Sequence, residues 1–343
     1  MTKTQCKSDR PIFVVGTPRS GTTLTARILG RHSKLFMPGE THFFEDIYSR
    51  AEELGLLDSP QAVKKISQRL FNLYERYNEP FDQKRIEGIF PTPDALEKAL
   101  VGCQSYGDLF ARFMEIQCDR EGKSRWGNNV PRDLFWVEEI LRFFPDAKFI
   151  VCVRDIRAFL LSYKGKWRIT RRENVDRLKA LYHPVITSFL WKSSMRRLPA
   201  IQKAVPQKNL LIMRYEDLVR DPEASVRRLC RTVEEEFEPA MLEVDSHNSS
   251  NALAAKGIFS SSIDRWRTDL APEEIAIAQA IAGPELEQLG YRLESIKVSQ
   301  LKVAVCIAST PFALWRALRA NRAVRGPIVP YLVRRLGSLV ASS

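Results

Sequence analysis

Residues 11–24 read PIFVVGTPRSGTTL, and this stretch decides the fold. Its first five residues are apolar and stop at Gly16, which is typical of a buried strand that ends in a tight turn. A helical pattern follows from Thr22 to Arg31. The glycines at 16 and 21 let the backbone turn so that successive N–H groups point at one anion, and the helix N-terminus adds partial positive charge. The stretch therefore predicts a strand, a phosphate-binding loop and a helix in succession.

Arg19 supplies the charge of this loop. The spacing G-x-x-x-x-G matches the loop of nucleoside triphosphatases, but Thr22 stands where those proteins carry the lysine that reaches the β- and γ-phosphates. We therefore expect an anion held by a guanidinium and by backbone N–H groups, without a metal ion. The alternative is a glycine-rich turn that binds no ligand. The residues expected to bind the anion are Thr17, Pro18, Arg19, Ser20, Gly21, Thr22 and Thr23.

Other short apolar runs alternate with helical patterns along the chain. Lys148–Val153 and Leu210–Met213 read as buried strands, and Lys34–Met37 reads as a further short strand. The predicted helices between and after them include Pro60–Tyr77, Tyr106–Arg120, Asp133–Phe144 and Pro222–Val233, the last with Asp221 as its N-cap. This alternation predicts an α/β fold with a three-layer, P-loop-type parallel sheet flanked by helices.

A second anion site is predicted where the strand Lys148–Val153 ends. Arg154 follows this strand directly, and Ser162 lies eight residues later. If a helix starts near Ile156, Ser162 lies two turns into it and Lys166 one turn further on the same face. A planar fork, a hydroxyl and a point charge would then converge on one phosphate. The alternative is a surface arginine beside a helical serine that binds nothing.

Both motifs resemble those of sulfotransferases that use 3′-phosphoadenylyl sulfate (PAPS). GTPRSGTTL is closer to the tyrosylprotein-type and bacterial branch of that family than to its cytosolic phenol and steroid enzymes, and the resemblance covers roughly residues 11–291. It implies that the loop Thr17–Thr23 binds the 5′-phosphosulfate of PAPS, the co-substrate. It also implies that Arg154, Ser162 and Lys166 bind its 3′-phosphate.

Two later segments also resemble the family. RYEDLV, residues 214–219, implies that Tyr215 contacts the adenine end of the nucleotide; the alternative is that its ring only packs under the following helix. KGIFSSSIDRWR, residues 256–267, resembles a segment that closes over the nucleotide. By position Lys256 and Arg265 could reach the phosphates, and a solvated charged loop is the alternative.

Transfer of a sulfuryl group needs a donor held in line, a stabilised leaving oxygen and a base for the acceptor proton. Arg19 is the candidate that contacts the leaving and transferring oxygens. Glu40 follows the strand Lys34–Met37, at the edge of the sheet where active-site groups gather. The resemblance implies that Glu40 is the base. His42 is the second candidate, because the cytosolic branch uses a histidine, although a lone histidine is more often structural.

Asn129 departs from the family pattern. The segment RWGNNVP, residues 125–131, resembles W-G-x-K-x-P, whose lysine contacts the bridging oxygen and steadies the leaving nucleotide. Asparagine keeps a hydrogen-bond donor but loses the charge, which costs transition-state stabilisation. Arg125 or Arg132 could compensate. Otherwise the chain is a slow enzyme or a nucleotide-binding member without turnover. A small-molecule kinase is a further alternative, against which the missing loop lysine counts.

The positive charge is concentrated at the C-terminal end. The 343 residues carry a formal net charge of +12, and residues 297–343 contain eight basic residues and no acidic one. The folded body is therefore nearly balanced, which argues against a nucleic-acid partner. We predict a polar segment 1–10, a sulfotransferase domain 11–296 and a basic helical C-terminal extension 297–343. Residues 301–336 mix apolar and basic residues, as in a peripheral helix on an anionic membrane or an accessory helix packed on the body.

The cysteines and the N-terminal residues indicate in which compartment of the cell the protein is expected. None of the six cysteines forms a CxxC pair or a zinc motif, and Cys152 and Cys230 lie in apolar runs that predict buried thiols. Residues 1–10 are polar and lack a signal-peptide core. We therefore expect a cytoplasmic protein, with the extension as its one candidate for membrane association. The acceptor is a small molecule, glycan, lipid or peptide that the sequence does not identify.

Overall fold

The structure, a computed structural model, describes residues 7–55, 57, 59–77, 88–169, 174–244, 258, 260 and 263–325. The chain divides into two compact units, each built from several segments. Unit 1 comprises Met1–Cys152, Ala200–Met213 and Asp221–Val244, and unit 2 comprises Val153–Pro199, Arg214–Arg220 and Asp245–Ser343. The chain passes from unit 1 to unit 2 at the last residue of two strands of the sheet.

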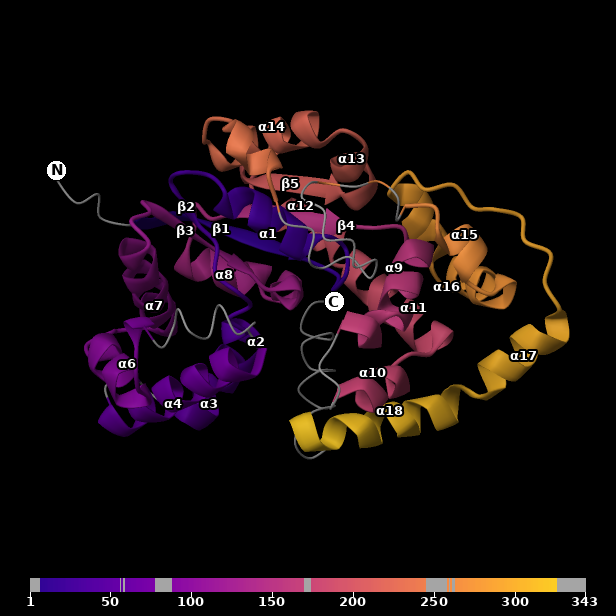
Figure 1. Ribbon diagram of the computed structural model, residues 1–343. Coiled ribbons are helices and arrows are strands. Elements are labelled where there is room, and N and C mark those ends of the chain that lie inside the picture. The colour runs from indigo at the N-terminus through magenta and orange to yellow at the C-terminus, as the bar shows by residue number, and fades with distance from the viewer. Residues whose placement is uncertain are drawn as a thin grey trace. The chain divides into compact units, whose positions relative to one another are not determined.

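The sheet of unit 1 positions the phosphate loop. Its strands are β1 (Lys7–Gly16), β2 (Leu35–Phe36), β3 (Arg125–Asn129), β4 (Lys148–Val153) and β5 (Leu210–Arg214), in the order β2-β3-β1-β4-β5 (Figure 1). β1 runs parallel to both β3 and β4, and β2 runs parallel to β3. The carboxyl ends of these strands therefore share one edge. The α/β fold with a parallel, P-loop-type sheet is as the sequence predicted.

The core of unit 1 forms where apolar strands meet aromatic helices. Ile12, Phe13, Val14 and Val15 are fully buried in β1, and the Phe13 ring stacks on Phe149 of β4 at 5.6 Å between centroids. The helices of unit 1 are α1 (Thr22–Gly30), α2 (Phe43–Asp46), α3 (Ala51–Leu54), α4 (Pro60–Tyr77), α6 (Pro93–Leu100), α7 (Tyr106–Arg120), α8 (Val137–Phe143) and α14 (Pro222–Val233). Short 3-10 turns are η1 (Tyr48–Arg50), η2 (Pro131–Phe135), η5 (Gln207–Asn209) and η6 (Pro239–Leu242), and α12 (Leu198–Ala204) joins the two units.

Several sequence predictions are confirmed in these elements. β4, α4, α7 and α14 have the predicted bounds, and the Asp221 side chain caps α14 by accepting a hydrogen bond from the Ala224 N–H at 3.1 Å. Cys152 and Cys230 are buried thiols. The single helix predicted over Asp133–Phe144 is wrong, because Trp136 leaves the helical region (φ −121°, ψ 15°) and separates η2 from α8. β3 was not predicted as a strand.

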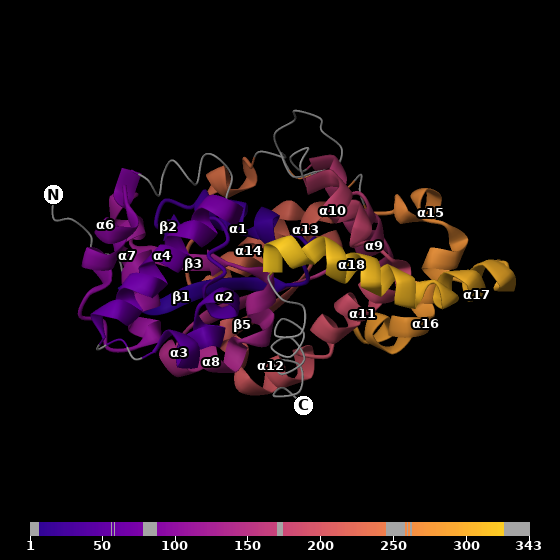
Figure 2. The same ribbon diagram turned by 90° about the horizontal axis from the view of Figure 1, so that it is seen from below.

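Unit 2 is helical and contains the segments that follow β4 and β5. Its elements are α9 (Ile156–Lys164), η3 (Lys166–Ile169), α10 (Val175–Ala180), α11 (Pro184–Met195), α13 (Tyr215–Arg220), α15 (Trp266–Asp269), α16 (Pro272–Gln288), α17 (Gln300–Ala308) and α18 (Thr310–Arg325) (Figure 2). α11 packs on α9 and α16, and α18 packs on α10. The predicted helix near Ile156 is therefore confirmed as α9.

Candidate active site

The turn between β1 and α1 requires glycine at its start. Gly16 lies opposite Cys152 of β4 and has a φ of 144°. A Cβ atom at this position would collide with the backbone carbonyl oxygen of Cys152. The backbone of the loop therefore passes close to β4, where no side chain fits. The sequence prediction that this glycine permits a tight turn agrees with this geometry.

The loop leaves the start of α1 without a side-chain cap. Gly21, at φ 93°, is the N-cap residue and has no side chain to accept a hydrogen bond from the first turn. The hydroxyls of Thr17 and Ser20 hydrogen-bond to each other, and the Ser20 N–H donates to the Thr17 carbonyl at 3.2 Å. These bonds fix the loop internally. The N–H groups at the start of α1 therefore receive no side-chain cap, and the positive end of the helix dipole lies at this turn.

Arg19 and His42 share an uncommon backbone conformation. Among the described residues, the non-glycine residues with positive φ are Arg19 (72°), His42 (50°) and Glu234 (59°). Such conformations cost energy in a non-glycine residue and are often retained at functional sites. Two of the three are residues that the sequence singled out as catalytic candidates.

Glu40 and His42 form an ion-paired cluster with Glu45. Glu40 lies in the turn after β2, and His42 is the N-cap residue of α2. His42 Nε2 lies 3.0 Å from a Glu40 carboxylate oxygen, and His42 Nδ1 lies 3.8 Å from one of Glu45. The Glu40 side chain is 35% exposed and that of His42 only 8%, so Glu40 is the more accessible of the two candidate bases.

The charge of His42 decides between these candidates. Burial alone would lower the pKa of His42, but hydrogen bonds to Glu40 and Glu45, together with their charges, raise it to about 10. The imidazole is therefore protonated at neutral pH and cannot accept a proton. Glu40 keeps the role of candidate base, and His42 becomes the cation that holds the Glu40 carboxylate in place.

A buried hydrogen-bond chain ties the Glu40 loop to the end of β3. The Thr41 hydroxyl donates to Asn128 Oδ1 at 3.0 Å, and Asn128 Nδ2 donates to Asp133 Oδ2 at 2.7 Å. All three side chains are fully buried. Burial raises the pKa of Asp133 well above its usual range. The roles of Asn128 and Asp133 could not be read from the sequence, because Thr41, which joins them to the Glu40 loop, lies 87 residues before Asn128.

Asn129 lies at the carboxyl end of β3, on the edge that carries the phosphate loop. It is paired in register with Val14, two residues before Gly16, and is 4% exposed. Its Oδ1 has no hydrogen-bond partner among the residues the structure describes. A buried amide oxygen without a partner is costly, so this position is suited to a ligand that donates a hydrogen bond.

The structure contradicts the expectation that Arg125 compensates for the lysine missing at position 129. Arg125 begins β3 and Asn129 ends it, so about 13 Å of strand separates them. The Arg125 guanidinium donates to the carbonyl oxygens of Arg10 and Val233, both at 2.5 Å. Arg132 follows β3 and lies 2.7 Å from a Glu45 carboxylate oxygen, so it is the arginine that joins the Glu40 and His42 cluster.

Arg154 is held rigidly in unit 2. Its guanidinium lies over the Tyr215 ring, 4.2 Å from the centroid, and its carbonyl oxygen accepts a hydrogen bond from Trp191 Nε1 at 2.9 Å. The side chain is 7% exposed. Tyr215 therefore contacts Arg154 as well as beginning α13, a role that the sequence did not suggest. Its predicted contact with adenine remains a prediction.

Ser162 and Lys166 do not share one helical face as predicted. Ser162 lies in α9 two turns from its start, but α9 ends at Lys164. Gly165 is the C-cap residue, and Lys166 begins the 3-10 turn η3. Gly165 keeps right-handed helical dihedrals (φ −86°, ψ 0°), so the chain turns from α9 directly into η3. Lys166 Nζ lies 5.8 Å from the Tyr163 ring.

A second hydrogen-bond chain supports the turn that carries Arg154. The Asp155 side chain caps α9, and the Asp155 N–H donates to Glu216 Oε1 at 3.1 Å. Glu216 Oε2 accepts a hydrogen bond from the Tyr291 hydroxyl at 2.8 Å. Burial raises the pKa of Glu216, although these hydrogen bonds act in the opposite direction. Glu216, within RYEDLV, is therefore a positioning residue that sequence analysis missed.

Two other residues, Arg265 and Lys256, were predicted to contact the phosphates, and the structure describes only the first. Arg265 is the N-cap residue of α15, and its guanidinium lies 2.7 Å from the Asp269 carboxylate. This local ion pair is the arrangement expected of the alternative, a charged loop. Lys256 lies outside the described residues.

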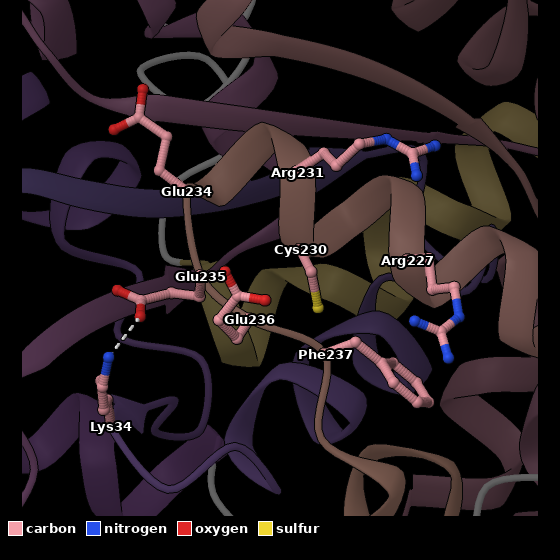
Figure 3. A pocket seen from close by; sticks show the side chains of 8 residues that line it. All are labelled: Lys34, Arg227, Cys230, Arg231, Glu234, Glu235, Glu236 and Phe237. Atoms are coloured by element: carbon pink, nitrogen blue, oxygen red, sulfur yellow. Dashed lines mark hydrogen bonds and ion pairs between the residues drawn. The ribbon is translucent and has the colours of Figure 1, made fainter.

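A hollow of about 540 Å³ lies elsewhere in unit 1 (Figure 3). Its lining comes mainly from the last turns of α14 and the residues that follow, together with Lys34, which precedes β2; Figure 3 shows Lys34 paired with Glu235, at 3.3 Å. Glu234, at its rim, pairs with Lys148, the first residue of β4. The hollow therefore borders the amino ends of the strands. It contains none of the predicted site residues, which follow the carboxyl ends.

Comparison with known proteins identifies a family model. A model described as the sulfotransferase family matches residues 11–239. An uncharacterized protein of Aquifex aeolicus is 28% identical over 269 residues, which cover 76% of this chain and 31% of that protein. Nodulation protein NoeE of Sinorhizobium fredii is 22% identical over 302 residues (81% and 65%). Protein-tyrosine sulfotransferase A of Caenorhabditis elegans is 22% identical over 293 residues (82% and 67%). The chain thus spans less than two thirds of the length of the first two relatives.

Solved structures show the same fold. The sulfotransferase domain of the Synechococcus PCC 7002 olefin synthase superposes with a TM-score of 0.54 at 23% identity, over 84% of this chain and all of that domain. The sulfotransferase domain from the curacin biosynthetic pathway gives a TM-score of 0.52 at 22% identity, over 83% of this chain and 99% of that domain.

Proposed function

Because the chain belongs to the sulfotransferase family, we propose that it transfers a sulfuryl group from PAPS to a hydroxyl or amine of its acceptor. The phosphate loop carries this proposal. Gly16 cannot be replaced, and the start of α1 has no side-chain cap, so the loop offers backbone N–H groups to an anion. Arg19, within the same loop, supplies the charge that a nucleoside triphosphatase would take from a lysine.

Two separate groups of residues are suited to bind the two ends of PAPS. The loop Thr17–Thr23 would hold the 5′-phosphosulfate, and Arg154 and Ser162 would hold the 3′-phosphate. Arg154 supports this assignment because packing of its guanidinium on the Tyr215 ring limits the conformations of the side chain, which lowers the entropy lost on binding. The bound donor supplies the activated sulfuryl group.

Glu40 would take the proton from the acceptor. Its carboxylate is the exposed member of the cluster, and the His42 imidazolium, 3.0 Å away, holds it in one orientation. Proton transfer to Glu40 would accompany attack of the acceptor oxygen or nitrogen on sulfur. Arg19 would stabilise the charge that develops on the leaving and transferring oxygens. The arrangement requires no metal ion.

A group that could bind a metal ion lies in the same cluster. His42, Glu45 and Asp46 offer ligand atoms within 4.8 Å of one another. A metal ion bound there would have to displace the proton from the His42 imidazole, whose pKa is raised to about 10. Arg132 lies 2.7 Å from Glu45, and Arg69 lies 3.9 Å from Asp46. These cations already balance the carboxylates, so we expect the cluster to function without a metal.

Label transfer tests the proposed reaction. The full chain is incubated with radiolabelled PAPS and a cell extract, and the labelled product is identified. Glu40→Gln should abolish transfer while leaving the calorimetric affinity for 3′-phosphoadenosine 5′-phosphate (PAP) unchanged. Glu52→Gln, an exposed position on α3, is the matched control and should retain transfer. Full transfer by Glu40→Gln would remove Glu40 as the base.

The second candidate is a nucleotide-binding member without turnover, which Asn129 favours. The family's lysine is replaced by a buried amide whose Oδ1 lacks a partner among the described residues. This candidate predicts PAP binding in calorimetry with no label transfer to any extract. A small-molecule kinase would instead bind ATP more tightly than PAP. We also propose that the acceptor is a small molecule, glycan, lipid or peptide and that the protein is cytoplasmic. We propose that the chain has three parts, with boundaries at residues 10 and 296.

A further inference from the structure

Exposed apolar side chains gather on two consecutive helices of unit 2. Of the nine large apolar side chains that the described part of the chain exposes, six lie within residues 301–315. They are Leu301, Val305, Ile307, Phe312, Leu314 and Trp315, and their exposed fractions run from 46% to 74%. We call these six residues, together with Arg319 and Arg322, the α17–α18 surface. Apolar groups gathered in this way mark an interaction site more often than a solvated helix.

The packing of α18 fixes which face points outward. Ala313 is 4% exposed, and the Arg316 guanidinium donates to the carbonyl oxygens of Ala180 and Tyr182 at 3.3 and 3.1 Å. These contacts hold α18 against α10, as Figures 1 and 2 both show. Because α18 is held in one orientation, the apolar side chains on its opposite face stay exposed to solvent.

α17 is held at both ends but buries nothing. The Ser299 hydroxyl accepts a hydrogen bond from the Lys302 N–H at its start, and the Ser309 hydroxyl lies 3.1 Å from His183 Nε2 just after its end. No residue of α17 is buried. An ordered helix that contributes nothing to a core is explained if its apolar residues have another surface to contact.

The charged side chains within residues 297–343 all have one sign, and one of them, Lys302, lies 3.5 Å from Glu273 of α16. Residues 297–343 contain eight basic residues and no acidic one. Arg319 lies over the Trp315 ring, 5.4 Å from its centroid, and this ring is stacked on Phe312 at 5.7 Å. Arg322 is also exposed, one turn further along α18. Aromatic rings bordered by arginines are complementary to the boundary between anionic headgroups and acyl chains.

The composition favours lying on a membrane over crossing one. No single described helix is long and apolar enough to span a bilayer; α17 and Thr310–Arg322 of α18 satisfy the criterion only as a pair bent by 42°. A crossing would also place Arg316 and Arg319 within the hydrocarbon layer, where each charge is costly. At the surface the same arginines contact headgroups.

We propose that the α17–α18 surface docks the protein on membranes that contain anionic lipid. Phe312 and Trp315 lie at the boundary between headgroups and acyl chains, and Arg319 and Arg322 contact the headgroup phosphates. The proposal rests on the described helices, and residues 326–336, predicted to share this role, lie outside them. It does not depend on the proposed sulfuryl transfer.

Vesicle sedimentation of the full chain tests the charge requirement. Binding should be strong to vesicles of phosphatidylcholine with 30% phosphatidylglycerol and weak to phosphatidylcholine alone, and it should fall as salt is raised. Arg319→Gln with Arg322→Gln should weaken partitioning to the anionic vesicles by about 25-fold. Arg120→Gln, an exposed arginine at the end of α7, is the control and should bind as the parent does. Equal binding to both vesicle types, or equal loss in the control, would overturn the proposal.

Aromatic variants test the apolar contact. Phe312→Ser with Trp315→Ser should reduce binding by about tenfold or more, whereas Phe189→Ser, which removes a phenylalanine 55% exposed on α11, should not. Trp315→Phe should abolish a blue shift of tryptophan emission when anionic vesicles are added, and this readout survives if the double variant misfolds.

Two other outcomes would also refute surface docking. Protein that resists extraction from vesicles by alkaline carbonate would be inserted rather than docked. No vesicle binding at all would refute the proposal; if the parent then self-associates in ultracentrifugation and the double aromatic variant does not, the surface is an interface between two copies of the chain.

Discussion

Replacement of His42 by glutamine should remove the permanent positive charge beside Glu40. The imidazole is 8% exposed, lies 3.0 Å from Glu40 and 3.8 Å from Glu45, and has a pKa raised to about 10. In the unfolded chain its pKa returns to about 6.5. The difference of about 3.5 units corresponds to about 5 kcal/mol of favourable interaction for the protonated form. Glutamine fills a similar space without the charge.

The sign of the pH dependence follows from the direction of this shift. A folded-state pKa above the unfolded value means that the folded protein binds the extra proton, so the stabilisation is complete below about pH 6.5. It declines as pH rises above 6.5 and is lost once pH passes about 10. Between pH 6.5 and 9 the free energy of unfolding should therefore fall by about 3 kcal/mol through His42 alone. His42→Gln should lose this part of the pH dependence.

Two measurements check this prediction. In protein labelled with ¹⁵N at its four histidines, the two-bond ¹H–¹⁵N spectrum should show a doubly protonated imidazole at pH 8.5 that His42→Gln loses. Urea unfolding at pH 6.5 and pH 9 should then show a smaller difference for His42→Gln than for the parent. Four neutral imidazoles at pH 8.5 would refute the reasoning and would return His42 to the candidate bases.

Further outcomes follow from the two anion sites and the metal question. Gly16→Ala should abolish PAP binding or folding, because its Cβ collides with the Cys152 carbonyl; binding of parental affinity would show that the loop does not need this glycine. Arg154→Ala should weaken PAP about 100-fold and ATP much less, and equal losses in calorimetry would contradict the 3′-phosphate assignment. Because Arg19 and the loop backbone supply the positive charge near the leaving group, Asn129→Lys should not raise the rate of label transfer, and a gain of about tenfold or more would show that the missing charge limits it. Dialysis against EDTA should leave transfer unchanged, and a loss restored by one divalent cation would contradict the metal-free site.

The sequence predicted those elements whose signal is local. Residues 11–15 of β1 and residues 149–153 of β4 are continuous apolar runs, and a strand buried on both faces needs such a run. The loop between β1 and α1 is marked by two glycines that the turn requires. β3 escaped prediction because RWGNN contains one large apolar residue, yet all five of its residues are buried. They are buried because β3 lies between β2 and β1, and strand order depends on the whole chain.

The cluster of Glu40, His42 and Glu45 was predictable in position but not in charge. Residues 34–40 indicate that Glu40 follows a strand. In such sheets active-site residues lie at the carboxyl ends of the strands. That His42 is a cation depends on Glu45 and on burial, and neither distances nor burial are visible in a sequence. The Thr41, Asn128 and Asp133 chain joins residues up to 92 positions apart. Lys166 was misplaced because α9 ends at Lys164, two residues too early for the helical spacing to hold.

The charges around Glu40 account for how an asparagine could stand at position 129. Glu40 and Glu45 are paired with His42 and Arg132, and burial raises the pKa of Asp133. A lysine at 129 would place a further cation at a position where Asn129 is only 4% exposed. Burying an unpaired charge is expensive, whereas an amide costs less and still donates a hydrogen bond. On this view Arg19 and the loop backbone would supply the positive charge near the leaving group. The His42 imidazolium would balance the charges of the carboxylates beside it, and a lysine at 129 would disturb that balance.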